Sequence, residues 1–128
     1  MVTVKEAQTF KGMFTWIDPD NFASEVLDER RPVLLSCVRV EDGFQEQLTI
    51  LKSLSEAYAG ALKICLLKED FLAAFHEKLG VIGTPTFIVL KGGMKVGRIL
   101  GQVNENRLAA FLARSLPELE GAFGRTDE

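Results

Sequence analysis

Cysteine is scarce in this sequence and is not arranged for structural or redox chemistry. Only Cys37 and Cys65 occur among the 128 residues. Two cysteines this far apart cannot form the disulfide framework that stabilises small secreted domains. They also do not form a Cys-x-x-Cys pair. The cysteine content therefore excludes a disulfide-rich secreted scaffold.

The sequence also lacks long hydrophobic runs and an excess of positive charge. Residues 1–6 contain no apolar signal core, and no run is long enough to span a membrane. We therefore expect a cytoplasmic protein with no membrane partner. The formal net charge is −3 and no basic face is evident, which argues against a nucleic-acid partner.

The composition is that of one globular domain. Hydrophobic residues make up 47% of the 128 positions, which is enough for a core and favours a folded chain over a disordered one. We expect an N-terminal extension at 1–13 that can hold a short helix, a folded domain at 14–116, and a polar C-terminal tail at 117–128.

Apolar runs alternate with amphipathic segments along the folded region. Continuous apolar runs predict strands that are buried on both faces, and leucines at helical spacing predict helices with one buried side. Asp18, Asp70 and Asn104 are expected N-caps. In chain order, the expected elements are a strand at 14–17, a helix after Asp18-Pro19, a strand at 32–38, a helix at 44–59, a strand at 61–67, a helix at 70–79, a strand at 85–90, a strand at 95–100 and a helix at 104–116.

The stretch from Gly80 to Leu90 organises this pattern. A helix ends at Gly80, the chain turns, and a buried strand begins at Pro85, where a strand tolerates proline. Lys91-Gly92-Gly93 then predicts a hairpin turn. The resulting order, β-α-β-α-β-α-β-β-α, predicts an α/β fold. Its central mixed sheet combines a parallel βαβ half with a C-terminal antiparallel hairpin, and helices cover both faces.

Residues 14–116 resemble the thioredoxin family. The resemblance rests on this element order and on Gly80-Val81-Ile82-Gly83-Thr84-Pro85-Thr86-Phe87 followed by Lys91-Gly92-Gly93. It implies a thioredoxin-like fold, in which this proline follows a cis peptide bond and faces the redox motif. In the family the residue before the proline pairs with a bound peptide. By resemblance those roles fall on Pro85 and Thr84, although only about 5–6% of X–Pro bonds in folded proteins are cis.

The sequence departs from the family at the redox motif. Thioredoxins carry Trp-Cys-Gly-Pro-Cys between the first buried strand and the long helix, whereas this chain has Val40-Glu41-Asp42-Gly43-Phe44 there. Glu41 stands at the position of the attacking cysteine and Phe44 at that of the resolving one. Disulfide exchange requires a thiolate, which neither residue supplies. The resemblance therefore implies a protein without dithiol activity.

Two further positions suggest the same loss. The family's buried aspartate matches Leu35 and its lysine companion matches Leu66, which suggests a core built for packing. Cys65, next to Leu66, should then face the opposite side of the sheet, whereas Cys37 should share the face of Leu35. We predict that the two cysteines are unbridged and that each acts as a small buried hydrophobe.

Other polar residues give weaker signals. Glu41, Asp42 and Glu46 lie near the start of the long helix, where stabilisation by the helix dipole is the simplest interpretation. A weak metal site or a carboxylate pair for hydrolysis is the sharper alternative. His76 follows Phe75 and should face outward, without a nucleophile to activate. We predict no metal, no cofactor and no catalytic residue.

The retained proline loop suggests a binding site for an extended peptide. An equally weighted interpretation is that its residues are kept only because the fold requires them. On the first interpretation the protein is an adaptor or assembly chaperone, a monomer or weak homodimer, that binds a protein or peptide partner. Alternatives are a redox protein acting through a single cysteine and a self-associating structural module. The expected groove residues are Val40, Glu41, Phe44, Thr84, Pro85, Leu100 and Gly101.

Overall fold

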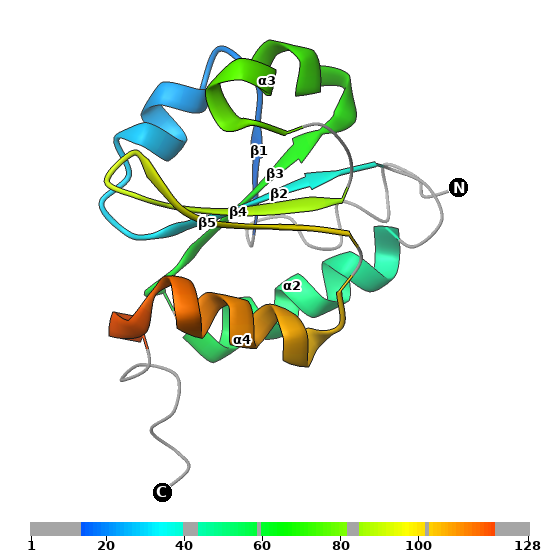
Figure 1. The fold of residues 1–128 in the computed structure, drawn as a ribbon, viewed down its shortest axis with the longest axis vertical. Helices are drawn as coiled ribbons and strands as arrows, with labels where there is room; N and C mark the ends of the chain where they lie inside the picture. Colours follow the sequence, from blue (N-terminus) through cyan, green and yellow to red (C-terminus); the bar gives the residue numbers. More distant parts are fainter. Residues whose placement is uncertain (1–13, 40–43, 59, 82–84, 102, 120–128) are drawn as a thin grey trace, which may run out of the picture.

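The computed structural model describes residues 14–39, 44–58, 60–81, 85–101 and 103–119. The helix expected within 1–13 lies outside these residues. In chain order the elements are β1 (Thr15–Ile17), the π-type helix η1 (Ala23–Leu27), β2 (Val33–Val38), α2 (Phe44–Tyr58), β3 (Lys63–Lys68), the 3-10 helix η2 (Glu69–Phe71), α3 (Leu72–Leu79), β4 (Thr86–Lys91), β5 (Met94–Leu100), α4 (Glu105–Ser115) and the 3-10 helix η3 (Pro117–Leu119). Figure 1 shows their arrangement.

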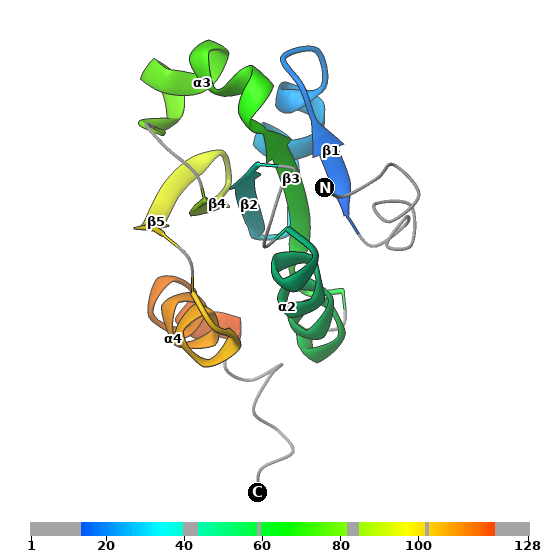
Figure 2. The same ribbon diagram turned by 90° about the vertical axis from the view of Figure 1, so that its right-hand side faces the viewer.

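The strands form one mixed sheet, as predicted. Its spatial order is β1-β3-β2-β4-β5. β1 and β2 pair with β3 in parallel, and β4 runs antiparallel to both β2 and β5. Figures 1 and 2 show α2 and α4 on one face of the sheet, with α3 and η1 on the other. The α/β class is therefore confirmed.

Two apolar layers hold the helices to the sheet. All six residues of β2 are buried, as its continuous apolar run predicted. Successive β2 residues point to opposite faces, so Leu34 packs in the layer beneath α2 and α4, whereas Leu35 packs in the layer beneath α3 and η1. The sheet is thus buried on both sides at its centre.

The helix end at Gly80, the N-cap at Asn104 and the hairpin turn at Gly92-Gly93 are confirmed. Gly80 ends α3 in the left-handed conformation, with φ +71°, and its N–H donates to the His76 carbonyl at 2.8 Å. The Asn104 side chain accepts a hydrogen bond from the Arg107 N–H at 2.8 Å and caps α4. Gly92 and Gly93 both have positive φ in the β4–β5 turn, which matches the predicted hairpin.

One predicted helix start is confirmed and one is wrong. The Asp18 carboxylate accepts hydrogen bonds from the N–H groups of Asp20 and Asn21, and its carbonyl accepts one from the Phe22 N–H at 3.1 Å, so Asp18 caps this segment as predicted, although the regular part of η1 begins at Ala23. Asp70 lies within η2, and no side chain caps α3. Phe71, the residue before α3, packs against the apolar layer beneath that helix. The packing of Phe71 coincides with the start of α3 at Leu72, which is later than the start predicted at Asp70.

Cys37 shares the face of Leu35 and Cys65 faces away from Leu66, as predicted, but the expectation that the two cysteines lie on opposite faces of the sheet is wrong. Cys37 and Cys65 lie in the same layer as Leu35, whereas Leu66 lies in the opposite layer. In the parallel register Leu35 is paired with Cys65. A shift of one residue along a strand reverses the face of every side chain, so matching the family's lysine to Leu66 gave the wrong face. Both thiols are free and buried.

Candidate functional site

Five strands meet at one end of the sheet, where the predicted site residues cluster. The parallel strands β1, β2 and β3 end there, β4 begins there, and β5 ends there. The register shows this directly, because Val38 pairs with Lys68, Cys37 with Thr86, and Thr86 with Leu100. Ligands of open α/β sheets bind beyond the carboxyl ends of the parallel strands, so we take this end as the candidate site.

The structure brings Pro85, Leu100 and Gly101 together. The Gly101 N–H donates to the Pro85 carbonyl at 2.8 Å, which joins the start of β4 to the end of β5. Gly101 has φ +102°, and a Cβ placed on it would meet no atom within 4 Å. The space beside its backbone is therefore open. Leu100 is 56% exposed and adds apolar surface next to this open backbone.

The other predicted groove residues lie outside the described residues or are buried. Val40, Glu41 and Thr84 are not among the described residues. Phe44 is the first residue of α2, is only 2% exposed and packs in the layer beneath α2 and α4. The expectation that its ring offers apolar surface is therefore wrong. Phe44 begins α2 on the side of the helix that faces the sheet, so its ring lies in the core.

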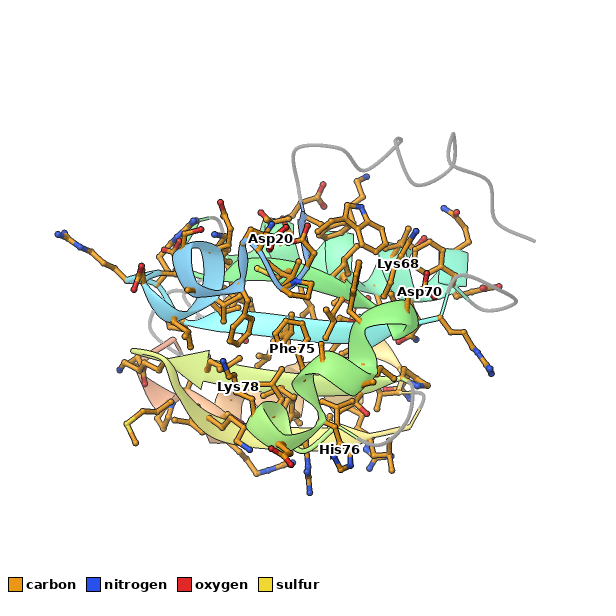
Figure 3. All side chains as sticks on the ribbon, turned by 90° about the horizontal axis from the view of Figure 1, so that it is seen from above. Asp20, Lys68, Asp70, Phe75, His76 and Lys78 are labelled. Atoms are coloured by element: carbon orange, nitrogen blue, oxygen red, sulfur yellow. The ribbon has the colours of Figure 1, made fainter. Side chains whose placement is uncertain are left out.

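Trp16 supplies an exposed aromatic surface that the sequence analysis missed. It lies on β1, is 37% exposed, and its ring centroid is 6.4 Å from that of Phe44. The Lys68 Nζ lies 5.8 Å from the Trp16 ring centroid, within the range of a cation–π contact. Figure 3 shows Lys68 close to Asp70, where β3 passes into η2. Trp16 and Ile17 are neighbours on β1 and point to opposite faces of the sheet. The Trp16 side chain is exposed because β1 lies at the sheet edge.

The carboxylates and the histidine form no metal centre within the described part of the chain. No group of three or more His, Cys, Asp or Glu residues there is placed to hold an ion. Glu46 is exposed on the first turn of α2, while Glu41 and Asp42 lie outside the described residues. His76 is exposed on α3, as predicted from its place beside the buried Phe75.

Both thiols are withdrawn from chemistry by burial. Cys37 and Cys65 are each 0% exposed. Burial raises the pKa of each thiol from 9.0 to about 12, because an apolar environment disfavours the thiolate. At neutral pH both are uncharged. A reactive cysteine needs an accessible thiolate, and neither residue provides one.

The described residues contain no helix of the length and apolarity that a bilayer crossing requires. The predicted absence of a membrane-spanning helix is therefore confirmed for this part of the chain.

Comparison with known proteins gives relatives of one kind. No protein-family model matches the chain. It is 28% identical to a thioredoxin of Synechocystis over 97 residues, covering 75% of this chain and 91% of that protein. It is 26% identical to thioredoxin 1 of Nostoc over 101 residues, covering 78% and 94%. It is 31% identical to a thioredoxin of Pseudomonas aeruginosa over 93 residues, covering 72% and 86%.

Proposed function

The chain belongs to the thioredoxin family, and from that premise we propose that it binds an extended protein segment without catalysing dithiol–disulfide exchange. It would act as an adaptor or assembly chaperone, with the binding site at the end of the sheet that carries Pro85 and Gly101. The observation that supports this most is the complete burial of Cys37 and Cys65.

The absence of thiol chemistry is supported by the residues around the expected reaction centre. The family's cysteine positions fall on Glu41 and Phe44, which cannot form a mixed disulfide. Leu35, which matches the family's buried aspartate, is 0% exposed and is paired with Cys65 and Ile88 on the neighbouring strands. Leu35 therefore supplies no carboxylate that could move a proton to or from a thiol.

Binding of an extended segment is supported by the surface that remains. An extended peptide binds through backbone hydrogen bonds and through apolar pockets for alternate side chains. The open space beside the Gly101 backbone would let an extended chain approach, and the exposed side chain of Leu100 offers it an apolar contact. Trp16 adds a partly exposed aromatic ring at the same end, and aromatic rings are frequent anchors in protein interfaces.

The two alternative functions are less well supported. A redox protein acting through one cysteine requires an exposed, acidic thiol, whereas both thiols are buried with a pKa of about 12. A self-associating module with its dimer contact at the apolar end near Val40 and Phe44 would not have the Phe44 ring available, because that ring lies in the core.

The first test is turnover of a protein disulfide by dithiothreitol, with and without the natural chain. We expect the chain to leave the rate unchanged, because neither thiol can attack. The matched variants are Cys37→Ala and Cys65→Ala, which keep a small apolar side chain at each site. An acceleration by the natural chain that disappears in either variant would refute the proposal.

The second test is capture of partners from the organism that carries the gene. We compare the natural chain with Leu100→Arg, which places a charge beside Gly101, and with Ala110→Arg, which places the same charge on the exposed face of α4. A partner should be retained by the natural chain and by Ala110→Arg and lost by Leu100→Arg. Thr84→Arg should behave like Leu100→Arg, since the resemblance places Thr84 beside the peptide. Equal capture by all four chains would show that this end of the sheet is not the binding site.

A further inference from the structure

The edge strand β5 carries three of the four exposed large apolar side chains among the described residues. These four are Trp16, Met94, Val96 and Leu100, and the last three lie on β5. Among the described strands, β5 pairs with β4 alone and forms one edge of the sheet. An edge strand presents unpaired N–H and C=O groups to solvent. Proteins usually protect such edges with charge, proline or a bulge, so apolar exposure there points to a binding surface.

The two cations of β5 are drawn away from the edge. The Lys95 Nζ donates to the Leu79 carbonyl at 3.2 Å, and the Arg98 Nη1 donates to the Gly80 carbonyl at 2.8 Å. Both contacts tie β5 to the end of α3, the helix on which Figure 3 labels His76 and Lys78. The charged groups therefore lie over the sheet face instead of blocking the outer backbone of the strand.

The strand is also held in place from the opposite face. A Cβ at Gly97 would overlap the Ser115 hydroxyl and lie 3.1 Å from Phe111 Cε1, so β5 lies directly against α4. A register shift between Val89 and Leu90 twists the hairpin end of the strand. The part from Gly97 to Leu100 pairs regularly with β4. A rigid edge of this kind costs little ordering when another strand binds.

The positive charge of Lys95 and Arg98 indicates what kind of segment would bind at this edge. Lys95 and Arg98 are both exposed, and their hydrogen-bond acceptors are neutral carbonyls. Neither forms an ion pair within the described part of the chain. A second copy of the chain would bring two more cations to the same edge, and like charges across paired strands are destabilising. An acidic segment would instead find charge complementarity and apolar contact together.

We propose that the outer edge of β5 is a second interaction surface, which binds an extended protein segment of alternating acidic and apolar character by strand addition. The segment would pair with residues 96–100, with its carboxylates beside Arg98 and Lys95 and its apolar side chains beside Val96 and Leu100. This surface shares Leu100 with the proposed site and extends from it along the outer edge of β5, away from Gly101. It can exist whether or not that site binds a peptide.

The sole tryptophan separates the two surfaces in an experiment. β1 and β5 form opposite edges of the sheet, so Trp16 on β1 lies four strand spacings, about 19 Å, from β5. A segment that adds to β5 should therefore leave the Trp16 indole signal unchanged. A segment that binds across the end of the sheet should change it.

The test is a titration of the isotope-labelled full chain with three blocked peptides, followed through its amide NMR signals. In the first peptide every second residue is threonine, and the positions between are glutamate and valine in turn. The second peptide has lysine in place of each glutamate. The third is the acidic peptide with a central proline. We expect only the first to bind, with shifts and slowed hydrogen exchange confined to residues 96–100. Val96→Glu should weaken this binding about tenfold by like-charge repulsion. The matched control Ala110→Glu, which adds the same charge on α4, should leave it unchanged.

Three outcomes would overturn the inference. The first is equal binding of the acidic and basic peptides, or binding of neither. The second is a shift pattern at Phe44, Trp16 and Leu100–Gly101 with residues 96–98 unmoved, which would assign the acidic peptide to the proposed site. The third is a concentration-dependent shift of the β5 amides without peptide, which would identify a second copy of the chain as the occupant.

Discussion

At the residue scale, the thiols of Cys37 and Cys65 behave as apolar groups. Both are fully buried in the layer beneath α3, and burial raises the pKa of each to about 12. We predict that neither reacts with a chromogenic disulfide reagent at pH 8 in the native chain. Both should react once denaturant is added. A stoichiometric reaction in the native state would contradict the burial of the thiols.

The same burial predicts how stability changes at alkaline pH. The folded thiols ionise near pH 12, whereas unfolded thiols ionise near their ordinary value of 9.0. The contribution of the buried thiols to the free energy of unfolding is therefore fully present below about pH 9. It is lost as the pH rises toward 12, because the thiols of the unfolded chain release their protons first. Replacing either cysteine by alanine should make this part of the pH profile shallower, as measured by denaturant unfolding.

Glu29 should control stability at acidic pH. Hydrogen bonds from the Arg31 side chain, at 2.8 Å, and from the Arg31 N–H, at 3.0 Å, lower the pKa of Glu29 from 4.5 to about 2. The Lys63 Nζ also lies 3.4 Å from the Glu29 Oε1. A depressed folded pKa gives stability that is present above about pH 4.5 and is lost as the pH falls toward 2. Glu29→Gln should flatten the unfolding profile in that window.

The control for Glu29 is a more exposed carboxylate with one cation. The pKa of Glu118 is lowered by a hydrogen bond from Lys91 at 2.6 Å, but the side chains of this pair are 42% and 52% exposed. Exposed ion pairs contribute little to stability. Glu118→Gln should therefore leave the acid profile near that of the natural chain. Equal effects of the two substitutions would show that the Glu29 cluster has no special role.

Sequence reasoning at this scale identified which residues are buried better than where they point. The burial of both cysteines followed from their place in apolar runs, which is a local property. Their faces depended on a residue-by-residue match to the family, and a shift of one position reversed the face of Leu66. The exposure of Trp16 was not predicted, because it depends on β1 forming the sheet edge, which is not a local property of the sequence.

At the element scale, close packing of β5 against α4 predicts that Gly97 cannot be enlarged without cost. The space for a Cβ is occupied by Ser115 and Phe111, so Gly97→Ala should destabilise the chain by about 1–3 kcal/mol through overpacking. Ser115→Ala removes the nearest atom and should recover part of the loss in the double variant. Denaturant unfolding of the single and double variants measures both terms. Full stability of Gly97→Ala alone would contradict this packing.

Elements were predicted well where the signal is contained in a few neighbouring residues. The caps at Gly80 and Asn104 and the Gly92-Gly93 turn depend only on local backbone geometry and hydrogen bonds. The cap at Asp18 is also confirmed, whereas the helix start at Asp70 was wrong because Asp70 lies in a 3-10 helix and α3 begins only at Leu72. A cap residue in the sequence indicates only that a helix can begin there.

At the scale of the whole molecule, the sheet order places the two proposed surfaces. β1 and β5 are the edges, which exposes Trp16 at one side of the candidate site and leaves the outer backbone of β5 unpaired. The sequence predicted a mixed sheet and its hairpin, but the apolar pattern alone does not show which strands become edges. The candidate site was therefore predicted through the proline loop, and the β5 surface emerged only from the structure.

Binding of an extended protein segment at the end of the sheet near Pro85 and Gly101 is tested by an amide NMR map of the labelled natural chain, titrated with the segment recovered from a captured partner. We expect the largest shifts at Phe44, Lys68 and Leu100–Gly101, together with a change in the Trp16 indole signal. If the largest shifts lie on α4 or on η1 while these signals stay fixed, the proposed site is wrong and the function belongs to another face.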